Sequence, residues 1–445
     1  INHYIENAVK KLKLKGFPDL IKGVRGTSNE DHTPENLVKG ILRAINELYV
    51  NKDGTIRYDM TEMPITAFRS KEISTSVEKL KLLGYEKDIY GNELENDDQL
   101  AEILPNDIIL PACIESPDEG ADLVFTRIAN FMDDLLEHFY GLPRFYNIKT
   151  REDLIGHLVI GLAPHTSAAI VGRIIGFSRT QGCFANPMWH AAQRRDCEGD
   201  EDCVILLLDA LINFSRKYLP AHRGSTQDAP LVITSTLIPS EVDDMVFDMD
   251  VVTEYPLEFY EAAEKYKWPW EIKIEQLKDR LGKDSQYYNF GFTHDTKDFN
   301  AGIRCSAYKS IPTMQDKVLG QIKLAEMIRA VDGADVARLV IERHFIRDIR
   351  GNMRKFSTQE FRCVSCNEKY RRPPLAGICL KCNGKLLFTV AEGFILKYLQ
   401  PALDLAAKFD LPPYLQQSLE ITKLRIESMF GKETEKQQEL KKWFT

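Results

Sequence analysis

The chain has 445 residues, of which 44% are hydrophobic and 28% are charged, and its formal net charge at pH 7 is −8. This length is too great for one ordinary hydrophobic core and predicts two to four domains. No apolar run approaches the ~20 residues of a membrane-spanning helix, so we expect no membrane association. The acidic balance argues against a basic coat over the whole surface, although a local basic groove beside acidic metal ligands remains compatible with it.

The chain begins INHYIENAVKKLKLKG, with neither an initiator Met nor the apolar centre of a signal peptide. The missing Met predicts a fragment of a longer chain or a processed one, and the cysteine usage described below predicts a cytoplasmic protein. Residues 1–115 predict a mixed α/β region. In it, VNKDGTIRYDM (50–60) carries an Asp-Gly turn followed by strand-like alternation, and DDQLAEILPNDIILP (97–111) ends in a buried strand.

Residues 116–255 predict a β-rich region. Apolar residues at helical spacing over 122–140 indicate a helix, and 151–178 alternates short apolar runs with turn residues. VILLLDALINFSRKYL (204–219) predicts a buried helix, and APLVITSTLIP (229–239) predicts a central strand.

Residues 256–357 predict a mainly helical region, most clearly over 314–345. Residues 358–390 hold a compact cysteine set, and 391–430 predict two C-terminal helices. The last segment, 431–445, is polar and charged until its end, which is typical of a flexible tail.

Four cysteines form two Cys-x2-Cys pairs separated by twelve residues: Cys363, Cys366, Cys379 and Cys382. Four thiolates on two tight turns close a tetrahedral shell around zinc and leave no open position for chemistry, so the spacing predicts a structural zinc ribbon. Between the pairs, Arg371 and Arg372 suit contact with phosphate or with an acidic protein, and both remain open. The other five cysteines have uneven spacing and are expected to be reduced.

An acidic run, RRDCEGDEDC (194–203), raises the question of a cation site. A calcium-binding EF-hand loop is excluded because, counting from Asp196, position 6 is Glu201 and position 12 is Leu207. A solvated acidic loop fits poorly between two apolar segments. The favoured alternative is a magnesium site in which Asp196, Glu198 and Asp200 converge around Gly199, with Arg194 and Arg195 as countercharge for phosphates.

The tail contains Gln437, Leu440, Trp443 and Phe444 in the pattern Gln-x-x-Leu-x-x-aromatic-aromatic. In one helical turn, Leu440, Trp443 and Phe444 form a single apolar face on a solvated tether. This segment resembles the sliding-clamp (PCNA) interaction box. The alternative is a terminal helix that packs on its own domain.

Long blocks of the sequence resemble the large subunit of the archaeal family D DNA polymerase. The blocks are 133–168, GRIIGFSRTQGCFANPMWHAAQRRDCEGDED (172–202), NFSRKYLP, DAPLV, EYPLEFYEA, FGFTHDT and EFRCVSCNEKYRRPPL. They run from about residue 20 to the end. The acidic run also resembles the metal loop of two-barrel polymerases.

The resemblance implies an α+β multidomain fold with a double-psi β-barrel over 116–255, a helical accessory region, a zinc ribbon and a clamp-binding tail. It implies a Mg²⁺- or Mn²⁺-dependent DNA polymerase that extends a primer 3′ end with deoxynucleotides. Glu198 and Asp200 would be the main catalytic metal ligands, with Asp196 third, and Arg194, Arg195 and His190 would contact nucleotide or nucleic acid. The implied partners are primer-template DNA, a small exonuclease subunit, the clamp, and a separate or missing N-terminal half that carries the first barrel.

The loop departs from the family pattern at Asn186, Gln193, Asp196 and Glu198, where the family has His, Lys, Asn and Asp. His190, Arg194, Arg195, Gly199 and Asp200 match it. Glu198 adds one methylene, and a misplacement on the order of 1 Å costs roughly 100-fold in rate. A non-catalytic, clamp- and DNA-binding replication scaffold therefore stays open as the alternative.

Weaker signals come from isolated residues. His165 and His294 lie in family blocks and would either line the site or serve the core. A set of cations would either follow a DNA backbone or line a solvated helix face: Arg343, Arg347, Arg350, Arg354 and Lys355.

Overall fold

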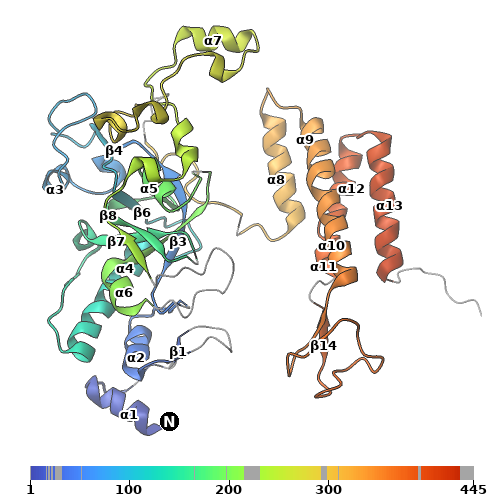
Figure 1. Cartoon of the computed structure of the whole chain (residues 1–445), viewed down its shortest axis with the longest axis horizontal. Coiled ribbons are helices and arrows are strands. Elements are labelled where there is room, and N and C mark those ends of the chain that lie inside the picture. Colours follow the sequence, from blue (N-terminus) through green and yellow to red (C-terminus); the bar gives the residue numbers. More distant parts are fainter. Residues whose placement is uncertain are drawn as a thin grey trace, which may run out of the picture. The chain divides into compact units, whose positions relative to one another are not determined.

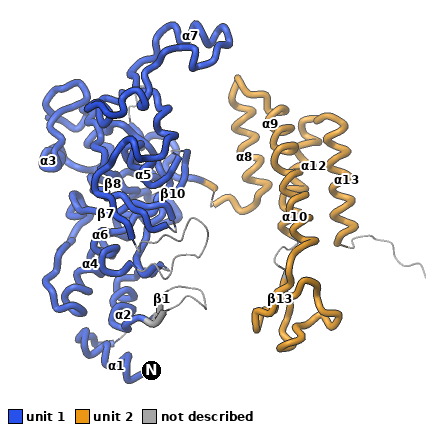
Figure 2. The backbone as a smooth tube through the Cα atoms, in the orientation of Figure 1, with its two compact units in different colours: residues 1–306 blue, residues 307–445 orange. Residues whose placement is uncertain are grey.

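The computed structural model describes residues 2–16, 18, 21, 24–25, 33–51, 53–164, 166–196, 198–214, 231–291, 298–308, 310–388 and 392–430. The chain forms two compact units, residues 1–306 and residues 307–445 (Figure 2). Each unit has its own hydrophobic core. Among the described residues, no helix combines the length and the hydropathy needed to cross a lipid bilayer.

The first unit is built on one mixed sheet whose strand order is β11-β8-β6-β9-β3-β10-β7, with a further pairing between β7 and β8. The long strand β8 pairs with β7 along 169–173 and with β6 along 173–178, so the pairings close into a ring of six strands. The pairs β3–β9, β6–β8 and β8–β11 are parallel, and the others are antiparallel. The strands are β3 (Tyr58–Pro64), β6 (Asp107–Pro111), β7 (Leu158–Leu162), β8 (Ala168–Ser178), β9 (Gly182–Ala185), β10 (Glu201–Leu206) and β11 (Val232–Thr234).

Trp189 packs against two glycines of this ring. A Cβ atom on Gly161 of β7 would lie 2.4 Å from the Trp189 ring, and one on Gly172 of β8 would lie 3.1 Å from it. The Trp189 indole N–H donates to the carbonyl of Val171 at 3.2 Å. The glycines therefore leave the room that the indole fills, and Trp189 fixes its helix against the sheet.

Helices α4, α5 and α6 pack against the sheet, whereas α7 projects away from it (Figure 1). The longest, α4, buries Phe125, Ile128 and Phe131 and continues into the π-helical turn η2. The helices are α1 (Asn2–Lys11), α2 (Leu37–Ile45), α3 (Val77–Leu82), α4 (Ala121–Asp134), η2 (Leu135–Tyr140), α5 (Pro187–Ala192), α6 (Leu207–Asn213) and α7 (Leu257–Glu264). The short strands are β1 (Val24–Arg25), β2 (Thr33–Pro34), β4 (Ala67–Arg69) and β5 (Leu100–Glu102), and the 3-10 turns are η1 (Ser70–Glu72), η3 (Arg151–Leu154), η5 (Pro239–Glu241), η6 (Asp244–Asp248), η7 (Pro269–Glu271), η8 (Leu277–Arg280) and η9 (Asp284–Gln286).

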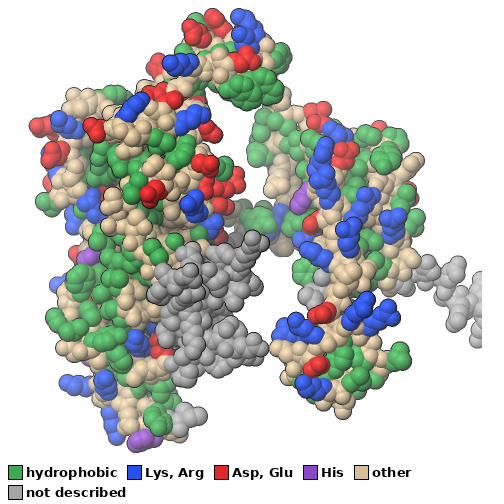
Figure 3. Space-filling view, in the orientation of Figure 1, with side chains coloured by type: hydrophobic (Ala, Val, Ile, Leu, Met, Phe, Trp, Pro, Cys, Tyr) green, Lys and Arg blue, Asp and Glu red, His purple; other side chains and the backbone are tan. Residues whose placement is uncertain are grey.

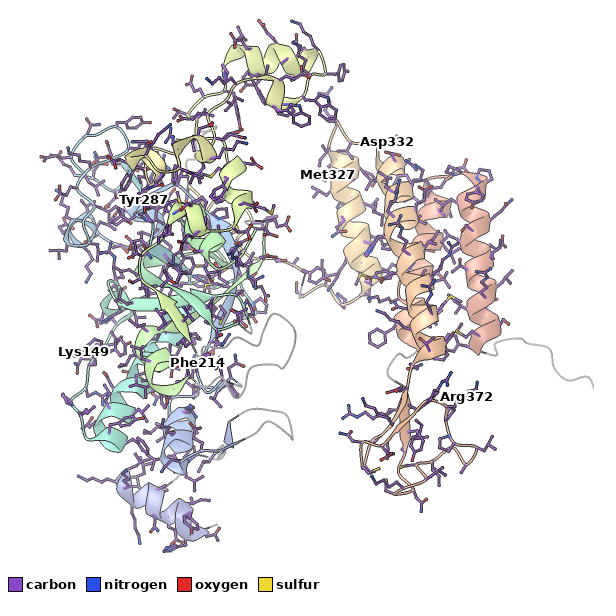
Figure 4. All side chains as sticks on the ribbon, in the orientation of Figure 1. Lys149, Phe214, Tyr287, Met327, Asp332 and Arg372 are labelled. Carbon is purple, nitrogen blue, oxygen red and sulfur yellow. The ribbon has the colours of Figure 1, made fainter. Side chains whose placement is uncertain are left out.

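The second unit is a helical bundle with a small cysteine-bearing sheet of order β13-β12-β14. Ile341, Phe345 and Leu419 lie in its apolar core. At the turn before α9, Asp332 (labelled in Figure 4) accepts hydrogen bonds from the amides of Ala334 and Asp335 and so caps that helix. The elements are α8 (Met314–Met327), α9 (Gly333–Val340), η10 (Ile341–Phe345), α10 (Ile346–Thr358), β12 (Phe361–Cys363), β13 (Lys369–Tyr370), β14 (Leu386–Phe388), α11 (Glu392–Leu396), α12 (Leu399–Lys408) and α13 (Pro413–Phe430).

Several expectations are confirmed and others are wrong. The helix over 122–140, the strand ending at Pro111 and the helices within 314–345 are present. The predicted helix from 204 is wrong at its start, because 201–206 is strand β10, which pairs on both sides. A short apolar run does not distinguish a buried strand from a buried helix.

Other differences concern position and extent. The segment 232–234 is a strand, but among the described strands it pairs with β8 alone, at the edge of the sheet. Between 256 and 306, the described residues form one helix, α7, and several 3-10 turns. The region 391–430 holds three helices instead of two. The sheet takes β3 and β6 from residues before 116, so it extends beyond the predicted range 116–255.

Candidate functional site

The acidic loop, residues 194–200, joins helix α5 to strand β10. Asn186 caps α5 by accepting from the amide of Met188, and Pro187 occupies the first helical turn. After the helix, Arg194 has φ +63° and Gly199 has φ +93°. The left-handed region is open to glycine without steric cost, so Gly199 turns the chain into β10.

The loop carboxylates differ in exposure. Glu198 is exposed, whereas Asp196 and Asp200 are half-buried. Arg195 lies 3.6 Å from Asp200, measured from Nη1 to Oδ2. In the described part of the chain, Asp196, Glu198 and Asp200 do not form a group whose oxygen atoms all lie within 4.8 Å of one another. The loop thus presents its carboxylates to solvent without gathering all three.

The donor chemistry of this loop fits a hard divalent cation. Carboxylate oxygens are the ligands that Mg²⁺ prefers, and Mg²⁺ retains several waters that an open loop can accommodate. Asp200 and Glu198 flank the flexible Gly199, and Arg195 beside Asp200 provides a cation for anionic substrate groups.

Beneath the loop lies a buried trio, which we define as Glu62, His190 and Asp202. Each has at most 1% of its surface exposed. His190 Nδ1 lies 2.6 Å from Asp202 Oδ2 and 3.9 Å from Glu62 Oε2. Their candidate ligand atoms all lie within 4.8 Å of one another.

Burial is the largest influence on Glu62 and raises the pKa of its carboxyl group. The charges of Asp202 and Asp200 act in the same direction. His190 and the hydrogen bond from the amide of Asp200 act in the opposite direction. Glu62 is therefore a carboxyl group whose environment favours the protonated form more than water does.

The sequence predicted only His190 of this trio, as a nucleotide contact. Its side chain is fully buried and its described hydrogen-bond partner is Asp202, so direct contact with a nucleotide does not fit this arrangement. Asp202 lies two residues after Asp200 in the acidic run, and this alternation could have indicated Asp202 as a site residue. Glu62 gave none, because its proximity results from a pairing between strands 138 residues apart.

The cysteine quartet is assembled as the spacing predicted. Cys363 Sγ lies 3.4 Å from Cys382 Sγ, and Cys366 Sγ lies 3.5 Å from Cys379 Sγ. Sulfurs bonded to one tetrahedral ion at about 2.3 Å are about 3.8 Å apart, so the observed spacing fits a metal. The hydroxyl of Tyr370, 3.2 Å from Cys379 Sγ, is the largest of the influences that lower the pKa of this thiol to about 6.

Backbone turns of one kind hold both halves of the quartet. Asn367 and Asn383, each directly after a Cys-x2-Cys pair, have φ +63° and φ +57°. Their amides donate to Cys363 and Cys379 at 3.1 and 2.8 Å. A Cβ atom on Gly384 would lie 2.8 Å from Cys363 Sγ, so the glycine leaves space for the sulfurs.

The remaining predicted residues are distributed as follows. Arg343, Arg347, Arg350, Arg354 and Lys355 are all exposed, and the four arginines recur at helical spacing along η10 and α10. Arg371 and Arg372 are exposed on the cysteine-bearing sheet module, where Figure 4 labels Arg372. Three predictions fall outside the described residues: His165, His294 and the tail set Gln437, Leu440, Trp443 and Phe444.

The ring of strands and the acidic loop at the start of β10 together form a candidate site for a divalent cation. A family model described as "DNA polymerase II large subunit DP2, catalytic domain" matches residues 14–317, which include the loop and the trio. The chain belongs to this family.

Similar proteins carry the name DNA polymerase II large subunit. That of Archaeoglobus fulgidus is 52% identical over 434 residues, covering 97% of this chain and 37% of that protein. That of Pyrococcus furiosus is 54% identical over 428 residues, covering 96% and 33%. That of Nanoarchaeum equitans is 52% identical over 449 residues, covering 97% and 36%. The chain thus spans about a third of the length of these relatives.

Proposed function

We propose that this chain is the part of a DNA-directed DNA polymerase large subunit that carries the catalytic carboxylates. It would act in DNA replication, adding deoxynucleotides to a primer 3′ end. The observation that carries this proposal is the solvent-accessible acidic loop at the start of β10, in a chain that belongs to the DP2 catalytic family. The names of the relatives support the same activity.

In this proposal, Asp200 and Glu198 hold Mg²⁺ or Mn²⁺, with Asp196 as a third ligand. A bound divalent cation would activate the primer 3′ oxygen for attack and would neutralise negative charge on the phosphates. Arg195, 3.6 Å from Asp200, would orient the triphosphate, and the exposed Arg194 would contact the template or incoming nucleotide. His190 would act through Asp202 instead of touching substrate.

The proposed fold is a double-psi β-barrel, the second of a two-barrel polymerase site. The closed ring of six strands with both parallel and antiparallel pairs supports it. The first barrel would come from a part of the large subunit that this chain does not contain. The greater length of the relatives is compatible with that arrangement.

Further partners follow from the same proposal. The cysteine quartet would hold a structural zinc ion, and the arginines of η10 and α10 would contact DNA phosphates. The tail residues Gln437, Leu440, Trp443 and Phe444 would bind the sliding clamp, which would raise the local concentration of polymerase at primer ends. A small exonuclease subunit would complete the complex in the cytoplasm.

Primer extension by a chimera tests the activity. The matched 434-residue segment of the Archaeoglobus fulgidus large subunit is replaced by this chain and assayed with its small subunit in Mg²⁺ or Mn²⁺. We expect primer extension, and we expect Asp200→Ala to lower its rate at least about 100-fold. A displacement of a catalytic group on the order of 1 Å already costs roughly 100-fold in rate, and this variant loses the metal ligand altogether. Glu258→Ala, at an exposed carboxylate of α7, is the matched control and should retain activity.

One observation favours the alternative of a non-catalytic scaffold: the three loop carboxylates are not gathered into one group. A folded chimera that binds clamp and DNA but extends no primer with either cation would establish the scaffold and end the polymerase proposal.

A further inference from the structure

The buried trio connects the three elements that frame the acidic loop. His190 lies in α5, which leads into the loop, Asp202 lies in β10, which leaves it, and Glu62 lies in β3, which pairs with β10. The contact between His190 and Asp202 therefore ties the two ends of the loop together across twelve residues. A loop whose two ends are tied has fewer conformations open to it.

Glu62 contacts the backbone of Asp200 in both directions. The amide of Glu62 donates to the Asp200 carbonyl at 2.9 Å, and Glu62 Oε1 accepts the Asp200 amide at 3.3 Å. The register between β3 and β10 places Glu201 opposite Thr61 and Asp202 opposite Met60, so Asp200 follows opposite Glu62. Residues opposite each other in a sheet share a face, and Asp202 shares it by alternation.

Burying the polar side chains of the trio costs free energy of folding. Glu62 Oε2, His190 Nε2 and Asp202 Oδ1 are buried without a hydrogen-bond partner among the described residues. A buried polar atom without a partner costs about 1–3 kcal/mol, and buried ionic sets are commonly replaced by apolar residues without loss of stability. Stability therefore does not explain the trio.

A metal ion is a poorer explanation of the same atoms. Two ligands bound to one ion at about 2.1 Å are separated by about 3 Å or more. The 2.6 Å between His190 Nδ1 and Asp202 Oδ2 is the length of a short hydrogen bond. The proton between them already fills the position that an ion would share.

We propose that Glu62, His190 and Asp202 are positioning residues that hold the Asp200 backbone and thereby set the geometry in which the acidic loop binds its divalent cation. The catalytic consequence rests on the proposed function. The positional claim stands by itself, because it concerns the backbone between 194 and 202.

Amide hydrogen exchange of the whole chain tests the positional claim. Glu62→Ala should accelerate exchange at least about tenfold in the segment 194–202, because the Asp200 amide loses its acceptor. Glu62→Gln keeps an acceptor oxygen at the same place and should restore most of the protection. His190→Asn keeps a donor near the Nδ1 position and should be milder than His190→Ala.

The matched control is Glu72→Ala in the same unit. Glu72 is also a buried glutamate, 3% exposed, that accepts the amides of Arg69 and Phe299 at 2.6 and 3.3 Å. It should alter exchange around its own contacts and leave 194–202 unchanged. Equal protection of 194–202 in Glu62→Ala and the unaltered chain would overturn the inference, whatever the enzyme does.

Manganese binding, followed by the paramagnetic signal of free Mn²⁺, measures the consequence for the site. We expect Glu62→Ala to weaken binding by tenfold or more, Glu62→Gln by less than about threefold, and Glu72→Ala not at all. Absence of Mn²⁺ binding in the unaltered chain would count against the proposed function. The hydrogen-exchange result would then decide by itself whether the trio positions the Asp200 backbone. A metal that co-purifies with the chain and is lost in His190→Ala would overturn positioning by hydrogen bonds.

Discussion

The two units of the chain fill their interiors with different chemistry. The first unit buries eight carboxylates in its described residues: Asp53, Glu62, Glu72, Asp88, Asp107, Asp133, Asp202 and Asp209. In the described residues of the second unit, the only buried polar side chain is that of Thr422. The interior of the first unit therefore places polar groups at a cost in stability, whereas the described core of the second unit is held by apolar packing.

Net charge separates the units in the same way. Residues 1–306 contain 34 Lys and Arg against 50 Asp and Glu, a net charge of −16, and residues 307–445 contain 24 against 16, a net charge of +8. Figure 3 shows Lys and Arg side chains along the helices and the cysteine module of the second unit. The overall charge of −8 is thus the sum of a basic second unit, which is suited to binding a polyanion, and an acidic first unit, which carries the candidate cation ligands.

The largest expected difference between the units concerns metal removal. Structural zinc contributes an apparent free energy of about 10–16 kcal/mol in zinc-finger peptides, so a chelator or Cys363→Ser with Cys379→Ser should unfold the module around 358–388. Limited trypsin digestion should then cut after Arg371, between the two cysteine pairs, while the first unit persists.

Cys305→Ser, at a half-buried cysteine of the first unit, is the control and should leave metal content unchanged. If chelation leaves the bond after Arg371 as resistant to trypsin as before, the cysteine quartet does not need a metal to fold.

The next effect is a pH dependence confined to the first unit. Complete burial raises the pKa of Asp209 from 3.8 to about 6. Between these values the folded state binds the proton that the unfolded state releases, so the free energy of unfolding falls as pH rises from about 4 to 6 and then levels off. The fall is on the order of 3 kcal/mol.

Asp209→Asn does not titrate and should remove the part of the fall that Asp209 contributes. It also removes one of the two acceptor oxygens that receive the backbone amide of Ile56 and the side-chain amide of Asn213. Urea unfolding from pH 4 to 7 measures it. Asp153, whose pKa is lowered by the amides of Thr150 and Lys149, provides the contrast: its contribution is present above its ordinary pKa and is lost as pH falls. A fall of undiminished size in Asp209→Asn would assign the dependence to other carboxyl groups.

The smallest expected effect is that of a Gly→Ala substitution made once in each unit. Gly161→Ala places a Cβ atom 2.4 Å from the Trp189 ring, so overpacking should lower the free energy of unfolding by about 1–3 kcal/mol. Gly320→Ala, in the middle of α8 with nothing within 4 Å, should raise it by about 0.5–1 kcal/mol. Opposite shifts in thermal unfolding are expected, and equal signs would contradict the packing described for Trp189.

Local features of the fold could be predicted from the sequence, and distant pairings could not. The cysteine quartet follows from spacing within twenty residues, and α8 and α9 follow from periodicity. Residues 204–206 were predicted as helix, because only the pairing of 201–206 with β3 and β7, distant in sequence, makes this segment a strand. For the same reason Glu62 carried no signal, whereas Asp200 lay within a recognisable run.

The closed ring gives the order of synthesis a physical consequence. β10 closes the ring by pairing with β3 and with β7, and it is the last of the six strands to be made. At synthesis rates of about 5–20 residues per second, β10 is completed roughly 7 to 30 s after β3. During that interval the nascent chain carries open strand edges, which favour aggregation. Co-translational protection by chaperones should therefore matter for residues 58–206 far more than for the helices that follow.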